Sequence, residues 1–221
     1  HAPCLHRHDY RWPLCYPTER PQRRPVARAV AAAHHRAVAR EGDEKMGDDP
    51  TRVAQAVAIE TLRQQFSASG QIAEVGLPTP VLRSWVRCQR LGLDMGERAR
   101  PPSTTRGDLM VARERSAALL AHASGVMEHL HEQIRASGSM VLLADASGLI
   151  LHGIGDPAFV DRANRVALQP GANWSECERG TNAIGATLVE RAAVEVFGAE
   201  HYLDCNGVLT CSAAPIVDWR G

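Results

Sequence analysis

The spacing of apolar residues predicts helices in the first half of the chain and several strands in the second. In residues 53–66 apolar side chains recur at near-helical intervals and end at Phe66, which predicts a helix. After a turn-rich stretch that ends at Pro80, a second helix is predicted over residues 81–91. The apolar surface of this second helix comes from Leu82, Trp85, Val86 and Cys88.

The predicted helix over residues 81–91 also carries a basic face. Arg83, Arg87 and Arg90 stand at i, i+4 and i+7, so their side chains point the same way. A face of this kind either lies in solvent behind the packed Trp85 or docks on phosphates. We favour the solvated face, because the sequence contains no complete helix-turn-helix pair.

A linker over residues 98–107 leads into the longest helical pattern of the chain, residues 108–136. Apolar and small residues step by threes and fours along it, as they do in a packing seam. This helix is expected to cover the domain that follows, to pair with a second copy of itself, or both. The residues of the seam are Leu109, Ser116, Leu119, Ala123, Val126 or Met127, Leu130 and Ile134.

From residue 140 the pattern changes to that of strands. The apolar run over 140–144, the turn Asp145–Gly148 and the run over 149–152 predict a hairpin. Gly153 and Gly155 are expected to end the second strand.

The rest of the chain alternates between helices and strands. A helix is predicted over residues 159–168, another around Thr187, and strands over 194–197 and 208–216. The order of these elements is typical of an α+β domain with an antiparallel sheet flanked by helices.

The segment GTNAIG at residues 180–185 opens the helix around Thr187 and is the strongest candidate for a ligand loop. The side chains of Thr181 and Asn182 can hold the free amides of the helix start, or they can contact a ligand; the two interpretations stand about even. A nucleotide phosphate loop is excluded, because Ala186-Thr187 stands where such a loop has Lys followed by Ser or Thr.

The first part of the chain, residues 1–45, has a different composition. It holds five of the 13 prolines and five of the 10 histidines, and a Pro/Arg-rich run over residues 17–25 breaks any helical or strand period. Met46 opens a more ordinary sequence. We therefore expect residues 1–45 to be a disordered or non-native leader, and its histidines to reflect composition rather than a metal site.

Composition adds three constraints. The formal charge is zero, so the net charge does not indicate nucleic acid or an acidic surface as a partner, although residues 1–45 carry a balance of +4. No apolar run reaches the roughly 20 residues that a membrane span needs, which favours a cytoplasmic protein without a membrane partner. The six cysteines form neither a CxxC pair nor a zinc-spaced set, so no metal or cofactor is expected.

Several motifs in order give the chain a family resemblance. The hairpin MVLLADASGLIL, GTNAIG, the triplet Glu200-His201-Tyr202 and LTCSAAPI resemble the sensory GAF domain of the acetoin and dihydroxyacetone operon regulators. These regulators are Fis-type, sigma-54-dependent transcriptional activators. Residues 84–88 and 92–94 resemble the lead-in to that domain, so the resemblance runs from about residue 72 to the end of the chain.

The resemblance implies a small-molecule sensor rather than an enzyme. It implies a helical lead-in and linker over residues 46–107, a GAF-like sensor domain over residues 108–221, and a pocket between the sheet and its helices. Candidate effector contacts combine apolar walls with a few polar groups, although each is as well explained as ordinary core. They are Trp174, Thr181, Asn182, His201, Tyr202 and Cys211.

The resemblance also implies partners and missing parts. DNA and sigma-54 RNA polymerase would be reached only through an ATPase domain and a helix-turn-helix that follow the sensor, and the effector would bias them across a homodimer formed by helix 108–136. Since the chain ends at Gly221, we expect a fragment whose last sheet strand is missing. Unpaired neighbours of that strand would make the chain poorly soluble or partly unfolded. The family usually has proline at Trp219, a departure confined to that turn.

One enzymatic alternative remains open. Some GAF domains reduce free methionine sulfoxide with a low-pKa cysteine and a resolving partner, and Cys177, Cys205 and Cys211 could supply such a set. Their spacing does not resemble that enzyme's pattern.

Overall fold

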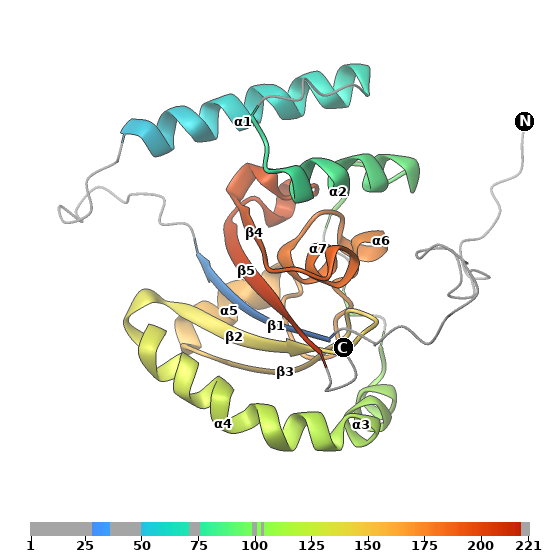
Figure 1. The fold of residues 1–221 in the computed structure, drawn as a ribbon, viewed down its shortest axis with the longest axis vertical. Helices are drawn as coiled ribbons and strands as arrows, with labels where there is room; N and C mark the ends of the chain where they lie inside the picture. The colour runs from blue at the N-terminus through green and yellow to red at the C-terminus, as the bar shows by residue number, and fades with distance from the viewer. Residues whose placement is uncertain (1–27, 36–49, 71–75, 99–100, 103, 218–221) are drawn as a thin grey trace, which may run out of the picture.

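The fold is organised around a single antiparallel sheet (Figure 1). The computed structural model describes residues 28–35, 50–70, 76–98, 101–102 and 104–217. Within them, the strands follow the order β3-β2-β1-β5-β4, and every neighbouring pair is antiparallel. The strands are β1 (Arg28–His35), β2 (Ser139–Ala144), β3 (Ile150–Gly155), β4 (Val194–Phe197) and β5 (Leu209–Ile216).

Helices lie on both faces of this sheet, as Figure 1 shows. The helix α4 crosses β2 and β3 on one face, and α7 packs on β1, β4 and β5 on the other, with α2 and α1 stacked beyond it. Short 3-10 turns at Arg135–Ser137, Gly198–Glu200 and Asp204–Asn206 complete the described part. The helices are α1 (Pro50–Ser69), α2 (Thr79–Arg90), α3 (Arg106–Arg115), α4 (Ala117–Ile134), α5 (Pro157–Arg165), α6 (Glu176–Arg179) and α7 (Ala183–Glu190).

The sheet separates two hydrophobic cores because successive strand residues point to opposite faces. On β2, Val141 and Leu143 pack with Met127 of α4 in the smaller core. Leu142 points the other way, into the larger core, which also contains Trp85 of α2. The lead-in helix α2 is therefore packed into the same core as the sheet, across the predicted domain border at residue 107.

The α+β class and the antiparallel sheet are confirmed, and most predicted helices and strands are present. Two boundaries were wrong. β3 continues through Gly155, because glycine there lets the strand lie against β2: a Cβ at this position would come within 2.5 Å of the Met140 Cβ. The predicted helix 108–136 is two helices, α3 and α4, that meet at Ser116. The short helix α6 was not predicted.

The prediction of an unstructured leader was wrong for residues 28–35. They form β1, which lies in the middle of the sheet and pairs with β2 along one edge and with β5 along the other. Residues 1–27 and 36–45 lie outside the described residues. In the described sheet, β1 pairs with both β2 and β5. The poor solubility of the chain remains a prediction.

No helix in the described ranges has the length and apolarity that crossing a bilayer requires.

Candidate functional site

The GTNAIG segment holds its own helix start. Asn182 is the N-cap of α7: its Oδ1 accepts from the Gly185 amide at 2.9 Å, and its Nδ2 donates to the Gly180 carbonyl at 2.9 Å. Gly180 has φ +64°, and a Cβ on it would lie 2.7 Å from the Tyr202 Cβ. The asparagine is thus used for capping, and Gly180 allows the loop to lie against Tyr202.

The side chain of Thr181 contacts α2, through Ser84 and Cys88. The Ser84 hydroxyl lies 2.7 Å from Thr181 Oγ1 and donates to Glu176 Oε1 at 2.6 Å. The Cys88 thiol is 3.6 Å from the same Thr181 oxygen. Ser84, Thr181 and Glu176 are all buried, so these polar groups satisfy one another at the contact of α2 with α6.

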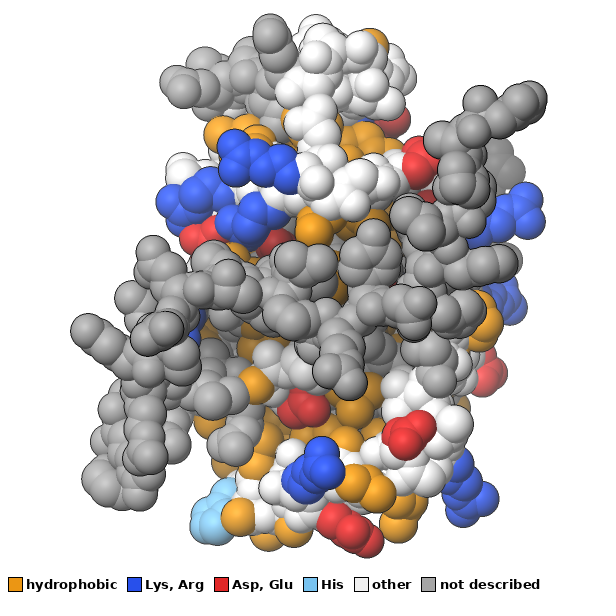
Figure 2. Space-filling model, turned by 90° about the vertical axis from the view of Figure 1, so that its right-hand side faces the viewer, with side chains coloured by type: hydrophobic (Ala, Val, Ile, Leu, Met, Phe, Trp, Pro, Cys, Tyr) orange, Lys and Arg blue, Asp and Glu red, His pale blue; other side chains and the backbone are white. Residues whose placement is uncertain are grey.

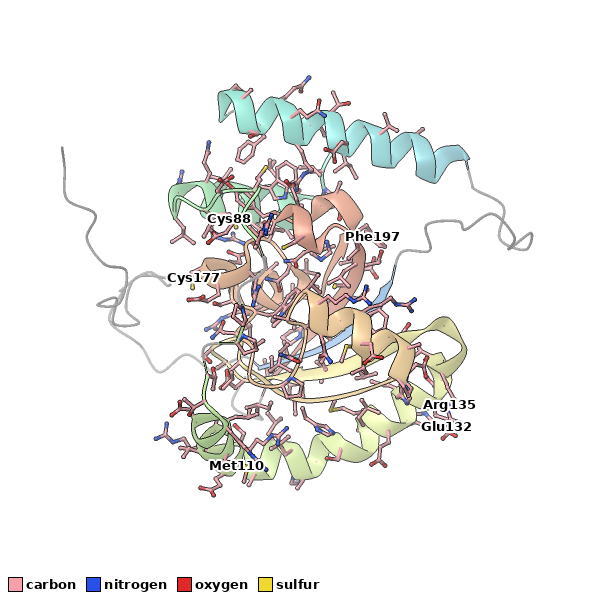
Figure 3. The ribbon with its side chains drawn as sticks, turned by 180° about the vertical axis from the view of Figure 1, so that it is seen from behind. Cys88, Met110, Glu132, Arg135, Cys177 and Phe197 are labelled. Atoms are coloured by element: carbon pink, nitrogen blue, oxygen red, sulfur yellow. The ribbon has the colours of Figure 1, made fainter. Side chains whose placement is uncertain are left out.

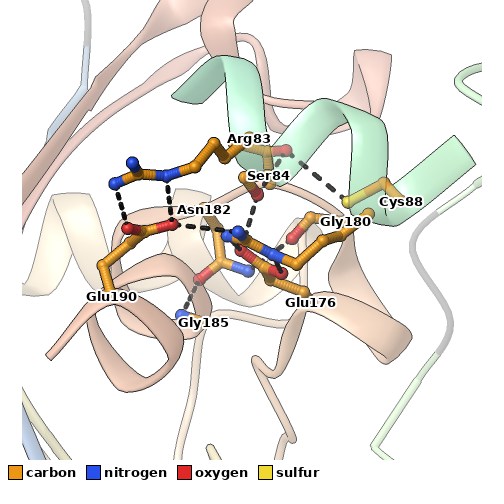
Figure 4. A network of polar contacts seen from close by, with 10 residues as sticks. Arg83, Ser84, Cys88, Glu176, Gly180, Asn182, Gly185 and Glu190 are labelled. Carbon is orange, nitrogen blue, oxygen red and sulfur yellow. Dashed lines mark hydrogen bonds and ion pairs between the residues drawn. The ribbon is translucent and has the colours of Figure 1, made fainter. Parts of the chain in front are cut away.

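Arg87 joins three helices through two carboxylates. Its Nε and Nη2 donate to the two oxygens of Glu176 at 2.7 Å each, and its Nη1 donates to Glu190 Oε1 at 2.9 Å. Arg83 also pairs with Glu190 (Figure 4). We call Arg83, Ser84, Arg87, Glu176, Thr181 and Glu190 the α2 clamp. Two arginines of the predicted basic face are therefore held by carboxylates of this chain.

The charges of the α2 clamp shift its pKa values in the directions expected of ion pairs. Burial opposes the charged form of Arg87, but its hydrogen bonds with Glu176 and Glu190 outweigh burial and raise its pKa. Burial likewise acts to raise the pKa of Glu190, and the hydrogen bonds from Arg83 and Arg87 prevail and lower it. Both groups are accordingly charged at neutral pH.

Arg63, which is buried, fastens α1 to the loop between β4 and β5. Arg63 donates to the carbonyls of Ala199 and Tyr202 at 3.1 Å each, and it also contacts the His201 carbonyl and the Asp204 carboxylate. Its guanidinium lies 5.7 Å from the centre of the Trp85 ring. Arg63 therefore ties this loop to both α1 and α2.

A small apolar cavity lies between the sheet and α7. The cavity is just large enough to hold about one water molecule. The cavity walls come from three strands, from α7 and from the loop that precedes α6. The lining residues are Ala31, Ala33, Leu142, Leu168, Trp174, Asn182, Ala183, Ile184 and Cys211.

The structure divides the predicted effector contacts into two groups. Trp174, Asn182 and Cys211 line the cavity. Thr181 belongs to the α2 clamp, while Tyr202 packs on Gly180 and donates through its hydroxyl to the Leu93 carbonyl at 3.2 Å. His201 is buried in the loop held by Arg63, and its Nδ1 lies 2.9 Å from the Gly198 carbonyl.

Sequence reasoning missed the partners that complete these arrangements. Glu176 and Glu190 are ordinary charged residues in the sequence, and Arg63 stands on a helix far from the loop that it holds. The i, i+4 spacing of Arg83 and Arg87 was the one usable signal, because it placed two guanidiniums where one neighbouring element could receive both. The cavity alanines of β1 gave no signal at all.

Two of the described cysteines, Cys88 and Cys211, are poorly suited to redox catalysis. Burial raises the pKa of both Cys88 and Cys211 to about 12, so both are protonated at neutral pH. Cys177 is half-buried on α6 beside Ser175, and Figure 3 shows it on the side of the molecule where Cys88 lies. Within the described residues, no group of three or more His, Cys, Asp or Glu side chains is arranged to hold a metal ion.

The chain is similar in sequence to bacterial transcriptional regulators. The chain is 31% identical over 153 residues to the acetoin dehydrogenase operon transcriptional activator AcoR of Bacillus subtilis, covering 69% of the chain and 25% of that protein. It is 32% identical over 142 residues to the acetoin catabolism regulatory protein of Cupriavidus necator, covering 64% and 21%. It is 28% identical over 155 residues to the propane 2-monooxygenase operon transcriptional activator MimR of Mycolicibacterium smegmatis, covering 70% and 25%.

A solved structure supports the fold independently. A chain in the crystal structure of the E. coli DhaR(N)–DhaL complex superposes with a TM-score of 0.55 at 18% identity, over 63% of this chain and 53% of that one. The predicted resemblance to acetoin operon regulators is confirmed by the sequence relatives, and the solved structure supports the fold. Since residues 55–220 match the family described as MimR, N-terminal domain, this chain belongs to that family.

Proposed function

We propose that the chain is the effector-sensing N-terminal part of a bacterial sigma-54-dependent transcriptional regulator. A small molecule bound by the GAF-like domain would control an ATPase domain and a DNA-binding domain elsewhere in the protein. The relatives are operon regulators, and the chain spans about a quarter of AcoR and of MimR. With this role we propose that the protein is cytoplasmic and that the chain catalyses no reaction.

The cavity beside α7 is the observation that carries the proposal, because it contains the predicted contacts Trp174, Asn182 and Cys211. Its walls bear no carboxylate, guanidinium or imidazole, and the Cys211 thiol is protonated at neutral pH because burial raises its pKa to about 12. An ion would lose its hydration there without gaining a countercharge. The effector is therefore a small neutral molecule, and binding must enlarge the cavity.

Calorimetric titration with small neutral oxygenated molecules tests this proposal. Acetoin, butane-2,3-diol, acetone and propan-2-ol are the probes, chosen for their size and lack of charge. We expect saturable binding of at least one probe. Cys211→Val should weaken binding at least tenfold, because its added volume enters the cavity.

The matched control for this experiment is Val57→Ala, on the exposed face of α1 and away from the cavity. It should leave the affinity unchanged. Binding that survives Cys211→Val would place the ligand elsewhere, and no binding of any probe up to tens of millimolar would contradict a sensor for this class of molecule.

A surface of α3 and α4 supports the predicted homodimer. α4 buries Ala123 and Met127 against the sheet, but Met110 and Val111 of α3 and Val126 of α4 are about half exposed. Figure 3 shows Met110 on α3, at the end of the molecule opposite α1. We propose that a second copy covers these apolar side chains.

Sedimentation equilibrium tests this pairing. The wild-type chain should dimerise, and Val126→Asp should shift it toward the monomer. A wild-type chain that remains monomeric at all concentrations measured would refute the pairing.

Two arginines of the basic face of α2, Arg83 and Arg87, are paired with carboxylates of this chain, which argues against direct contact with DNA. In Figure 2 a group of basic side chains lies at the upper left, with acidic side chains beside it. Binding to DNA through phosphates needs a continuous basic surface. We therefore assign DNA binding to other parts of the regulator.

A further inference from the structure

We propose that β1 is the specificity-determining wall of the effector cavity, with Ala31 and Ala33 setting the size of molecule that the domain admits. This inference rests on the proposed function for the identity of the ligand, but the wall itself can be tested without one.

The register of β1 places these alanines at the cavity. Ala33 is paired with Cys211 of β5, and Ala31 is paired with Leu142 of β2, and all four residues line the cavity. Because strand residues alternate, Ala29, Ala31 and Ala33 share one face, while Ala32 points to the other. Ala29 is fully buried too, but it does not line the cavity.

This wall has a different origin from the rest of the cavity. The other lining residues fall between Leu142 and Cys211, inside the matched range 55–220, whereas β1 ends at His35, before that range begins. The cavity is therefore formed partly by residues of the matched range and partly by β1, which lies before that range. A change in β1 would alter the cavity without altering any residue of the matched range.

Alanine is the side chain that creates the space. A larger side chain at position 31 or 33 would point at Leu142, Ile184 and Cys211 and occupy the cavity, whereas glycine would enlarge it. The lining contains no ionisable group that selects a ligand by charge at neutral pH. We therefore expect selection by size, and β1 contributes the smallest side chains, Ala31 and Ala33.

The test compares four variants of the whole chain: Ala33→Val, Ala33→Gly, Ala29→Val and Ala32→Val. Ala29→Val is the control for added volume on the same face away from the cavity. Ala32→Val is the control for a β-branched residue on the opposite face. Each variant is measured by thermal unfolding and by calorimetric titration with acetone and with the larger acetoin.

In thermal unfolding, Ala33→Val should lower Tm less than Ala29→Val does, because part of its added volume enters the cavity. Ala29→Val should lower Tm by several degrees, because Ala29 is fully buried and does not line the cavity. In titration, Ala33→Val should weaken the binding of acetoin at least tenfold and the binding of acetone by a smaller factor. Ala33→Gly should raise the affinity for acetoin relative to that for acetone. Ala32→Val should leave both affinities unchanged.

The outcomes separate this inference from the proposed function. If the wild-type chain binds a probe and Ala33→Val binds it with the same affinity, β1 does not set the size of the ligand. If the wild-type chain binds no probe, the proposed ligand class is wrong. Thermal unfolding still tests whether Ala33 faces the cavity. An equal loss of Tm in Ala33→Val and Ala29→Val would then show that Ala33 faces no open space.

Discussion

At the scale of single residues, the molecule uses its buried polar side chains to join elements that are far apart in the sequence. Arg87 connects α2 to Glu176 and Glu190, and Arg63 connects α1 to the loop after β4. A buried charge is tolerated when its partners satisfy it, and removing one partner leaves the other in a place that water cannot reach. These residues should therefore affect folding more than their surface neighbours do.

Replacing Arg87 tests the α2 clamp. Arg87→Ala leaves the buried Glu176 carboxylate without its guanidinium, so we expect the free energy of unfolding to fall by about 3 kcal/mol. Urea denaturation followed by circular dichroism gives this value. Arg90→Ala, on the exposed side of the same helix, should change it by less than about 0.5 kcal/mol. Equal effects of the two substitutions would show that the clamp adds nothing.

His201 makes the stability of the fold depend on pH. Its complete burial lowers its pKa from the ordinary 6.5 to about 4, opposed by its hydrogen bond with Gly198 and aided by the nearby Arg63. Below pH 6.5 the unfolded chain binds a proton at this residue that the folded chain does not. Stability should therefore fall as pH drops from about 6.5 to about 4, with no further loss from this residue below that range.

The variant His201→Gln isolates this effect, since its amide can still donate to the Gly198 carbonyl. The wild-type chain should lose about 3 kcal/mol more stability than the variant between pH 7 and pH 4. Urea denaturation at both pH values provides the comparison. Parallel pH profiles would mean that His201 is solvated or charged in the folded chain.

At the scale of elements, β1 has the most consequences, because it completes the sheet between β2 and β5 and also forms a cavity wall. Its sequence, RAVAAAHH, explains why it was not predicted. Alanine favours helices, and the strand has no alternation of apolar and polar residues. The strand exists because two neighbouring strands offer hydrogen bonds on both sides, and this is a tertiary cause that local sequence does not carry.

A proline in β1 tests this arrangement. Ala31→Pro removes a backbone donor from a strand with neighbours on both sides, so Tm should fall by about 10 °C or more. Scanning calorimetry measures the shift, and Ala32→Val serves as the tolerated substitution. A melt identical to that of the wild-type chain would show that β1 is not part of the folded sheet.

Other elements followed from the sequence because their signals were local. β2 is an uninterrupted buried run, and α7 is capped at its start by Asn182, a role that the sequence allowed. The candidate site was harder to predict, because residues adjacent in sequence point in different directions. Thr181 enters the α2 clamp, whereas Asn182 faces the cavity.

At the scale of the whole molecule, the α2 clamp, the loop held by Arg63 and the cavity surround the GTNAIG segment from three sides. Tyr202 donates its backbone amide to the Thr181 carbonyl at 3.2 Å, so the loop after β4 is joined to the same segment. A ligand that enlarges the cavity would press on Asn182 and α7, and through the α2 clamp on α2. This route offers a sensor a way to pass on occupancy as movement of its helices.

The central claim is that a small neutral molecule binds between β1 and α7. A methyl NMR titration of the chain with acetoin tests it most directly. We predict saturable shifts of the Ile184, Leu142 and Ala33 methyl groups, and none for Val57 on the exposed face of α1. Saturable shifts confined to methyl groups outside the cavity, or no shifts at tens of millimolar acetoin, would contradict the account.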